Sequence, residues 1–409
     1  MGTVIHPLIH DWNGDSAFSR PVAMLDDETL RDGLQSPSVR TPTIDQKIDL
    51  LRRMDVLGID TANIGLPGAG PHVAADVERL ARAIGDERLT IRANCAARTV
   101  VADIKPIADI SQRTGVAIEC CAFIGSSPIR QYVEGWTLDY LQRMTEEAIG
   151  FAVKEGLQVM YVTEDTTRAD PASLRVLFTA AIRAGASRLC IADTVGHATP
   201  RGARAVVRYA NTLIDELGAQ VGIDWHGHRD RGLDVACALA ALEAGASRLH
   251  GAALGIGERC GNTPIDLLLV NLVMMGYIDR DLTTLPAYCE AVSRACDVPV
   301  PANYPVVGAD AFRTATGVHA AAVVKAFRKH DRALMDAVYA AVPASLVGRT
   351  QEIEVGPMSG RSNVVFWLES RGLPTTDEVV DRIFTEAKAS NRTLTPEQIQ
   401  KILLASRVS

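Results

Sequence analysis

One pattern constrains the fold of this chain more than any other. Between Val22 and Val270, short β-like runs alternate with longer segments of helical periodicity. In segments such as "TLDYLQRMTEEAIGFAVKEG", apolar residues recur at intervals of three and four, as on one face of a helix. The predicted strands are residues 22–28, 59–66, 89–95, 117–124, 158–165, 187–194, 221–228 and 247–254.

Eight strand–helix units in succession are typical of a (β/α)8 TIM barrel, an α/β fold with a closed parallel sheet. A short repeat supports this interpretation, because "AGASRL" occurs at 184–189 and again at 244–249, each time between a helix and a strand. A doubly wound open sheet is the alternative architecture for the same alternation. We predict the barrel.

The sequence changes character after the eighth unit. The segment "TTLPAYCEAVSRACDVPVPANYPVVGADAF" predicts a helix followed by proline-rich extended chain. The remainder, to Ser409, is mostly of helical pattern. We therefore predict an N-terminal extension at 1–21, a catalytic barrel domain at 22–276, and a linker with a small, mainly helical domain at 277–409.

Composition excludes several kinds of partner. The 409 residues are 47% hydrophobic and 22% charged, with a net charge of -7, whereas nucleic-acid binders normally present a basic surface. No apolar run is long enough to span a membrane, and the N-terminal stretch lacks the pattern of a secretory signal. The eight cysteines form no CxxC pair, which is typical of buried thiols in a reducing compartment. We expect a cytoplasmic protein that binds neither nucleic acid nor membrane.

The stretch "DWHGHRDRG", residues 224–232, indicates a metal site. His226 and His228 alternate along a predicted strand, so both side chains lie on one face. Active-site residues of barrels lie at the C-terminal ends of the strands, where the first strand offers Asp32 and the loop after the eighth offers Asn262. This mixed nitrogen and oxygen set suits a divalent ion that also binds a substrate.

Five motifs carry a resemblance to a known family. "DETLRDGLQ", "EDTTRAD", "ADTVGHATP", "HGHRDRGLDVA" and "GIGERCGN" occur in the family's order. The chain resembles the metal-dependent acyl transferases and lyases that include 2-isopropylmalate synthase, homocitrate synthase and hydroxymethylglutaryl-CoA lyase. "GERCGN" and "GVHAAAVVKA" are more similar to the condensing synthases. The resemblance implies a Claisen-type condensation of acetyl-CoA with a 2-oxo acid, then thioester hydrolysis, with Mn²⁺, Mg²⁺, Zn²⁺ or Co²⁺ as the metal.

The resemblance also implies roles for single residues. Arg31 would stabilise the alkoxide that develops on the substrate, and Glu164 matches the family's catalytic glutamate near the acetyl group. Thr194 matches the threonine that hydrogen-bonds the substrate carboxylate. His319 and Tyr339 match second-domain residues that reach the site of a neighbouring subunit, with His319 a candidate base. The working unit would then be a domain-swapped homodimer.

The substrate is less sharply indicated, because the chain departs from the family pattern. Arg229 stands where the family usually has asparagine, and Arg130 where isopropylmalate synthases typically have histidine. A guanidinium binds carboxylate or phosphonate well. We therefore expect Arg130 and Arg229, with Gln35 and Thr194, to bind a 2-oxo acid with a second anionic group, such as 2-oxoglutarate, oxaloacetate or phosphonopyruvate.

Several alternatives stay open. The enzyme could act on 2-oxoisovalerate, although the tail after Leu373 is too short for the regulatory domain of leucine-feedback synthases. The same metal site suits a carbon–carbon lyase. A metal-dependent hydrolase and a non-catalytic binding module are less favoured, since barrel hydrolases carry their HxH pair on the first strand. Among single residues, Glu164 and Thr194 are alternatively helix caps, and Tyr339 a packing residue.

Overall fold

The structure is a computed structural model that describes residues 6–13 and 23–406. The predicted extension at 1–21 therefore lies outside the described residues except for 6–13. The chain divides into two compact units. One contains the described residues of Ala17–Arg280 and Ala287–Pro299, and the other those of Met1–Ser16, Asp281–Pro286 and Val300–Ser409.

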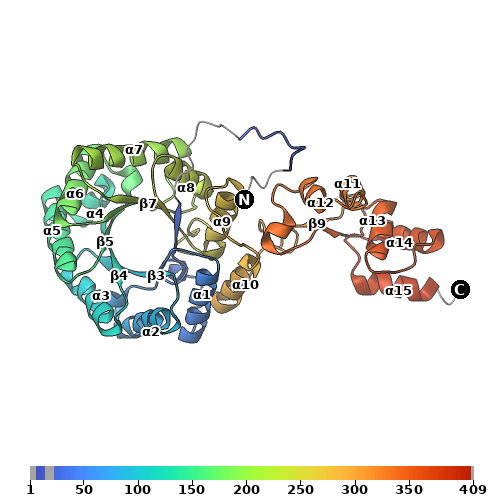
Figure 1. Ribbon diagram of the computed structural model, residues 1–409, viewed down its shortest axis with the longest axis horizontal. Helices are drawn as coiled ribbons and strands as arrows, with labels where there is room; N and C mark the ends of the chain where they lie inside the picture. The colour runs from blue at the N-terminus through green and yellow to red at the C-terminus, as the bar shows by residue number, and fades with distance from the viewer. Residues whose placement is uncertain (1–5, 14–22, 407–409) are drawn as a thin grey trace. The chain divides into compact units, whose positions relative to one another are not determined.

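The first unit is a closed barrel of eight parallel strands, which follow one another in chain order (Figure 1). Pairing of Met24 with Arg248 joins the first strand to the last and closes the sheet. The strands are β1 (Met24–Asp27), β2 (Thr61–Asn63), β3 (Arg92–Arg98), β4 (Ile118–Gly125), β5 (Val159–Glu164), β6 (Arg188–Asp193), β7 (Gly222–Gly227) and β8 (Arg248–Gly251). The barrel prediction is confirmed, and the open sheet is excluded.

Helices surround this barrel (Figure 1). Their capping residues explain where several of them begin: the Thr137 side chain accepts from the backbone of Tyr140 at the start of α5, and Asp170 accepts from Ser173 at the start of α6. The helices are α1 (Ile44–Val56), α2 (Pro71–Glu87), α3 (Val101–Thr114), α4 (Pro128–Glu134), α5 (Leu138–Lys154), α6 (Pro171–Ala184), α7 (Pro200–Glu216), α8 (Asp234–Glu243), α9 (Ile265–Met274) and α10 (Leu285–Cys296).

The predicted strands overlap all eight observed strands, but some boundaries differ. Residues 89–95 were expected to form the third strand, whereas β3 begins at Arg92. The reason is a local turn, in which the Asp55 carboxylate accepts hydrogen bonds from the backbone of Thr90 and Ile91. Strand β8 ends at Gly251 rather than at residue 254, because a 3-10 turn follows.

Charged side chains fill part of the barrel interior, where apolar layers are more usual. Asp224 is fully buried on β7 and binds Arg188 and Arg248, each at 2.5 Å. Its second oxygen also lies 2.8 Å from His250 Nε2. Arg248 reaches across to Glu119 on β4 at 2.7 Å. This charged interior lies next to the cavity described below.

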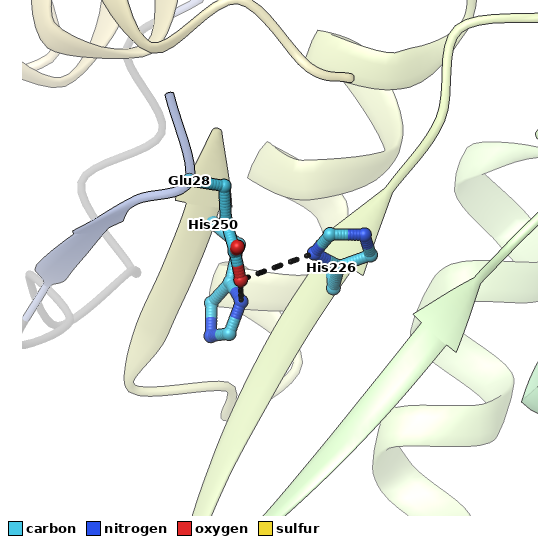
Figure 2. A group of neighbouring side chains, drawn as sticks. All are labelled: Glu28, His226 and His250. Atoms are coloured by element: carbon cyan, nitrogen blue, oxygen red, sulfur yellow. Dashed lines mark ion pairs between the residues drawn. The ribbon is translucent and has the colours of Figure 1, made fainter. Parts of the chain in front are cut away.

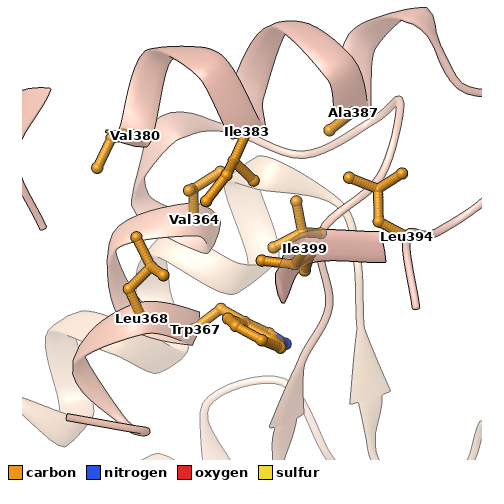
Figure 3. Packing of buried hydrophobic residues seen from close by; sticks show 9 residues of the cluster. Val364, Trp367, Leu368, Val380, Ile383, Ala387, Leu394 and Ile399 are labelled. Atoms are coloured by element: carbon orange, nitrogen blue, oxygen red, sulfur yellow. The ribbon is translucent and has the colours of Figure 1, made fainter. Parts of the chain in front are cut away.

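The second unit is mainly helical, as predicted. It contains α11 (Gly317–Phe327), α12 (Arg332–Ala337), α13 (Arg361–Glu369), α14 (Asp377–Ala389) and α15 (Pro396–Ser406). Figure 3 shows its principal core, which consists of Val355, Val364, Trp367, Leu368, Val380, Ile383, Ala387, Leu394 and Ile399. Two short paired strands, β9 (Arg313–Thr314) and β10 (Glu352–Ile353), were not predicted. The domain boundary at residue 276 stays a prediction.

Two general features bear on the environment of the protein. Among the described residues, no helix combines the length and apolar character that crossing a membrane requires. The eight cysteines are free, and all except Cys260 are buried.

Candidate active site

The predicted metal ligands come from three neighbouring strand ends of the barrel. Asp32 follows β1, His226 lies in β7, and His228 comes directly after β7. An isolated antiparallel bridge pairs the backbone of Asn262, in the loop after β8, with that of His228. Closure of the barrel between β1 and β8 thus brings Asp32 together with two histidines that follow it by 194 and 196 positions.

Three of these side chains direct their ligand atoms at one point. The Nε2 atoms of His226 and His228 are 3.3 Å apart. They lie 3.4 and 3.8 Å from Oδ2 of Asp32. All three residues are buried, and their potential ligand atoms lie within 4.8 Å of one another. This geometry agrees with the prediction that Asp32, His226 and His228 converge.

Two buried oxygens of the predicted ligand residues suit a cation. Oδ1 of Asp32 and Oδ1 of Asn262 have no hydrogen-bond partner among the described residues. The Asn262 amide nitrogen donates to the carbonyl of Ile256 at 3.1 Å, which leaves the amide oxygen as the unused atom. Buried polar atoms normally have partners. The donor set therefore fits a divalent ion that accepts mixed imidazole and oxygen ligands.

The protonation states also fit. Burial, reinforced by His226, lowers the pKa of His228 to about 4, so this imidazole is neutral at neutral pH. Burial acts to raise the pKa of Asp32, but Arg31 and the two histidines outweigh it and hold that pKa well below its usual range. A neutral imidazole and an ionised carboxylate are the forms that bind metals.

The glycine-rich loop after β8 places Asn262. Gly261 has a φ of +105°, and a Cβ atom there would lie 1.8 Å from the carbonyl oxygen of Gly255. Any side chain at Gly261 would therefore displace the loop that carries Asn262.

Arg31 lies beside these residues with its guanidinium between two carboxylates. Nη2 is 2.6 Å from Oε2 of Glu28, and Nη1 is 3.1 Å from Oδ2 of Asp32. Burial acts against the charge of Arg31, but the two carboxylates outweigh it and raise its pKa. For Glu28, burial likewise acts upward, but Arg31 and two histidines lower the pKa to about 2.

Thr194 follows β6 directly, and Glu164 is the last residue of the neighbouring strand β5. The Thr194 hydroxyl accepts from the backbone N–H of Asp165 at 2.8 Å, so its own hydrogen remains available for a ligand. Burial raises the pKa of Glu164. Neither residue caps a helix, since Thr199 caps α7 and Asp170 caps α6. The capping alternatives are thus wrong.

These residues surround a cavity of about 300 Å³ at the C-terminal ends of the strands. Its lining contains both polar and apolar residues. The polar residues are Glu28, Arg31, Asp32, Gln35, Asn63, Glu164, Thr194, His226, His228, His250, Glu258 and Arg259. The others are Leu66, Ala96, Cys121, Phe123, Met160, Val162, Cys190 and Ala192.

Three residues that were predicted within the barrel unit lie outside this lining. Asn262 is buried behind the cavity beside His228. Arg130 pairs with Glu134 at 3.1 Å on the exposed side of α4, although its charge acts on Glu164. The Arg229 guanidinium is directed at the carbonyl of Leu254, at 3.5 Å.

The two second-unit residues form a pair. The rings of His319 and Tyr339 are stacked, with centroids 4.2 Å apart and an interplanar angle of 26°. Both residues are exposed. The expectation that they act at the site of another subunit stays a prediction.

Two of the lining residues, Arg259 and His250, were missed by reasoning from the sequence. Arg259 donates to the carbonyl of Thr194 at 2.5 Å and binds Asp230 at the cavity mouth. His250 lies between Asp224 and Glu28. Burial lowers the pKa of His250, but the surrounding carboxylates outweigh this effect and raise it to about 10. The available signal was strand alternation, which puts His250 two residues after the inward-facing Arg248.

A parallel (β/α)8 barrel whose strand ends carry converging imidazoles and carboxylates is the architecture of a barrel enzyme. The chain belongs to the HMGL-like family, whose model matches residues 23–291, more than half of the chain. By this membership and its curated relatives, which are synthases, it is an enzyme of the acyltransferase-type condensing class.

Two relatives show the degree of similarity. A homocitrate synthase of Methanopyrus kandleri is 32% identical over 89% of this chain and 86% of its own length. A 2-isopropylmalate synthase of Pyrococcus furiosus is 30% identical over 88% of this chain and 71% of its own. Among solved structures, an HMG-CoA lyase of Bacillus subtilis superposes with a TM-score of 0.57. It covers 69% of this chain and 96% of its own at 19% identity, and this likeness shows the fold alone.

Proposed function

We propose that this protein condenses acetyl-CoA with a 2-oxo acid in a Claisen-type reaction and hydrolyses the resulting thioester to give a 2-alkylmalate-type product and CoA. The observation that carries the proposal is the convergence of Asp32, His226 and His228 beside Arg31 in one cavity. The curated relatives named as synthases support the same reaction class.

A divalent ion on Asp32, His226, His228 and Asn262 would supply Lewis acidity toward the keto oxygen of the 2-oxo acid. Arg31 is fixed by two carboxylates and carries a permanent charge, so its guanidinium can stabilise negative charge that develops on that oxygen. Because the guanidinium is already held in place, little reorganisation is needed during the reaction.

Thr194 orients the substrate in this proposal. Its hydroxyl oxygen already accepts from the backbone of Asp165, and its hydrogen can therefore be donated to a substrate carboxylate oxygen. Gln35 lines the same cavity and can contribute a second polar contact.

Glu164 would hold a proton near the acetyl group. Burial raises its pKa, so this carboxyl group is more readily protonated than that of an exposed glutamate. We propose His319, stacked on Tyr339, as the base that removes the methyl proton of acetyl-CoA, acting at the site of a second copy in a homodimer. The predominantly buried free cysteines suit a reducing compartment, and we propose that the enzyme acts in the cytoplasm.

The identity of the 2-oxo acid depends on which part of the lining meets its 2-substituent. We propose a second anionic group held by cations at the rim. Arg130 supports this, because its charge acts on Glu164 at the cavity. The apolar residues of the lining, among them Phe123 and Val162, favour an aliphatic substituent such as that of 2-oxoisovalerate, which is the alternative.

The test is release of free thiol from acetyl-CoA with added Mn²⁺ and a panel of 2-oxoisovalerate, pyruvate, oxaloacetate, 2-oxoglutarate, glyoxylate and phosphonopyruvate. Metal-dependent release with one of these acids is the expected result. If no acid of the panel causes thiol release and hydroxymethylglutaryl-CoA is cleaved to acetoacetate, the protein is a lyase and the proposed synthase activity is wrong.

A further inference from the structure

Glu28 lies directly behind the proposed metal ligands and contacts more than one of the functional groups. It follows β1 immediately, is 1% exposed, and its backbone N–H donates to the carbonyl of Gly251 at 2.7 Å. Figure 2 shows its carboxylate facing His226 and His250. Oε1 lies 3.8 Å from Nδ1 of His226 and 3.3 Å from Nδ1 of His250. Oε2 lies 2.6 Å from Nη2 of Arg31.

The two nitrogens of the His226 ring face different partners. Nε2 faces Asp32 and His228, whereas Nδ1 faces the Glu28 carboxylate. At 3.8 Å the Glu28 carboxylate is too far from Nδ1 for a hydrogen bond, but its negative charge favours the tautomer with hydrogen on that nitrogen, which leaves a lone pair on Nε2 for a metal ion. The partner of a ligating histidine also fixes the orientation of its ring.

We infer that Glu28 is a positioning residue that orients two functional groups at once, the His226 imidazole toward the metal and the Arg31 guanidinium toward the reacting oxygen. The inference rests on the proposed function, since it presupposes the metal site. Its physical basis is that one buried carboxylate binds Arg31 with one oxygen and faces Nδ1 of His226 with the other.

A second cation is the competing explanation for this arrangement. Glu28, His226 and His250 also present ligand atoms within 4.8 Å of one another. The positions of the neighbouring cations argue against it. The carboxylate of Glu28 is already bound by Arg31, and the other nitrogen of His250 binds Asp224, which Arg188 and Arg248 also neutralise. A divalent ion bound there would have to displace the Glu28–Arg31 and His250–Asp224 ion pairs.

The experiment compares wild type with Glu28→Gln, which keeps the side-chain shape and removes its charge. The matched control is Glu119→Gln, which removes a carboxylate with an 11% exposed side chain from the same barrel interior, where its one ion pair among the described residues is with Arg248. Calorimetry without substrates measures the affinities for Mn²⁺ and Co²⁺. The visible spectrum of bound Co²⁺ reports the ligand geometry, and elemental analysis gives the number of metal ions per chain.

We expect one ion per wild-type chain. Glu28→Gln should weaken metal affinity about 10–100-fold and change the Co²⁺ spectrum. At saturating metal it should also lower kcat with little change in KM, because Arg31 loses its anchor. Glu119→Gln should leave affinity and spectrum unchanged. Should Glu28→Gln fold poorly, Glu28→Asp keeps the charge while withdrawing the carboxylate from His226, and its affinity should fall in the same way.

An unchanged affinity and spectrum in both Glu28 variants would overturn the inference. So would two ions per wild-type chain falling to one in Glu28→Gln, since Glu28 would then be a ligand. Wild type that binds no divalent ion would overturn both the inference and the metal site. If Glu28→Gln weakens metal binding but wild type releases no thiol with any 2-oxo acid, the positioning role of Glu28 is retained and only the proposed reaction is rejected.

Discussion

Arg31 allows the effects of charge and of geometry to be separated at a single position. Arg31→Lys keeps the positive charge beside Glu28 and Asp32 but loses the planar fork that contacts both. We expect kcat to fall about 100–1,000-fold, the cost of removing one oxyanion donor. Metal affinity should stay within a few-fold of wild type, because the ligands are untouched. Steady-state thiol release and Mn²⁺ calorimetry measure the two quantities, and an unchanged kcat would remove Arg31 from the mechanism.

The preference for an anionic substituent is likewise a question about one residue. Arg130→Ala should raise KM for a dicarboxylic or phosphonate 2-oxo acid about 10–100-fold, since hydrogen bonds to charged groups contribute about 1.5–3 kcal/mol. KM for 2-oxoisovalerate should change little. Arg143→Ala, on the exposed side of α5, is the control. Equal effects of Arg130→Ala on the KM of both substrates would indicate that the apolar residues of the cavity lining determine the substrate preference.

At the scale of elements, Asp27 connects β1 to α10. Its carboxyl oxygens accept hydrogen bonds from the Tyr288 hydroxyl at 2.6 Å and from the backbone of Thr29 at 2.8 Å. Burial raises the pKa of Asp27 from 3.8 to about 7, an effect that these hydrogen bonds only partly offset.

The raised pKa predicts how this contact depends on pH. Between pH 3.8 and about 7, the folded protein holds a proton that the unfolded chain has released, so stability falls as pH rises through this window. Asp27→Asn cannot titrate. Its unfolding free energy relative to wild type should therefore rise with pH, by on the order of 1–4 kcal/mol. Denaturant unfolding across the window measures this, and a constant difference would mean that Asp27 is ionised when folded.

The loop after β8 gives a second prediction at this scale. Gly261→Ala introduces a Cβ against the carbonyl of Gly255, in addition to the cost of a positive φ. Gly232→Ala carries only the second cost, about 1–2 kcal/mol, because nothing lies within 4 Å of a Cβ there. We expect Gly261→Ala to lose more stability and also to weaken Mn²⁺ binding through Asn262. Equal losses in unfolding free energy and unchanged Mn²⁺ titrations would show that the loop adapts freely.

At the scale of the whole molecule, the proposed action of His319 at the site of a second subunit can be tested. If His319 acts at the site of a second copy, His319→Ala and Arg31→Lys chains should complement each other in mixed dimers, because one of the two sites is then intact. Co-expression with two affinity tags isolates the mixed species, and light scattering verifies its size. Recovered thiol release beyond that of either parent is expected. A mixed dimer as inactive as its parents would confine His319 to its own chain.

Local patterns explain why so much of the fold was predictable. Strand and helix periodicities depend on neighbouring residues, and eight repeats of the same unit leave few architectures other than a barrel. The converging Asp32, His226 and His228 were likewise predictable, because strand alternation and the position of barrel active sites follow from general rules. The two-residue strands β9 and β10 were not, since two residues carry no periodicity.

The sequence by itself thus determined the barrel, the helical second unit and the residues that meet at the strand ends. Only the tertiary structure decided that Arg259 rather than Arg229 lines the cavity, and that Glu28 contacts both Arg31 and His226. The physical reason is distance along the chain. Which side chains from β1, β7 and β8 meet depends on register around a closed sheet and on loop conformations at positive φ, and neither is expressed in the periodicity of any single segment.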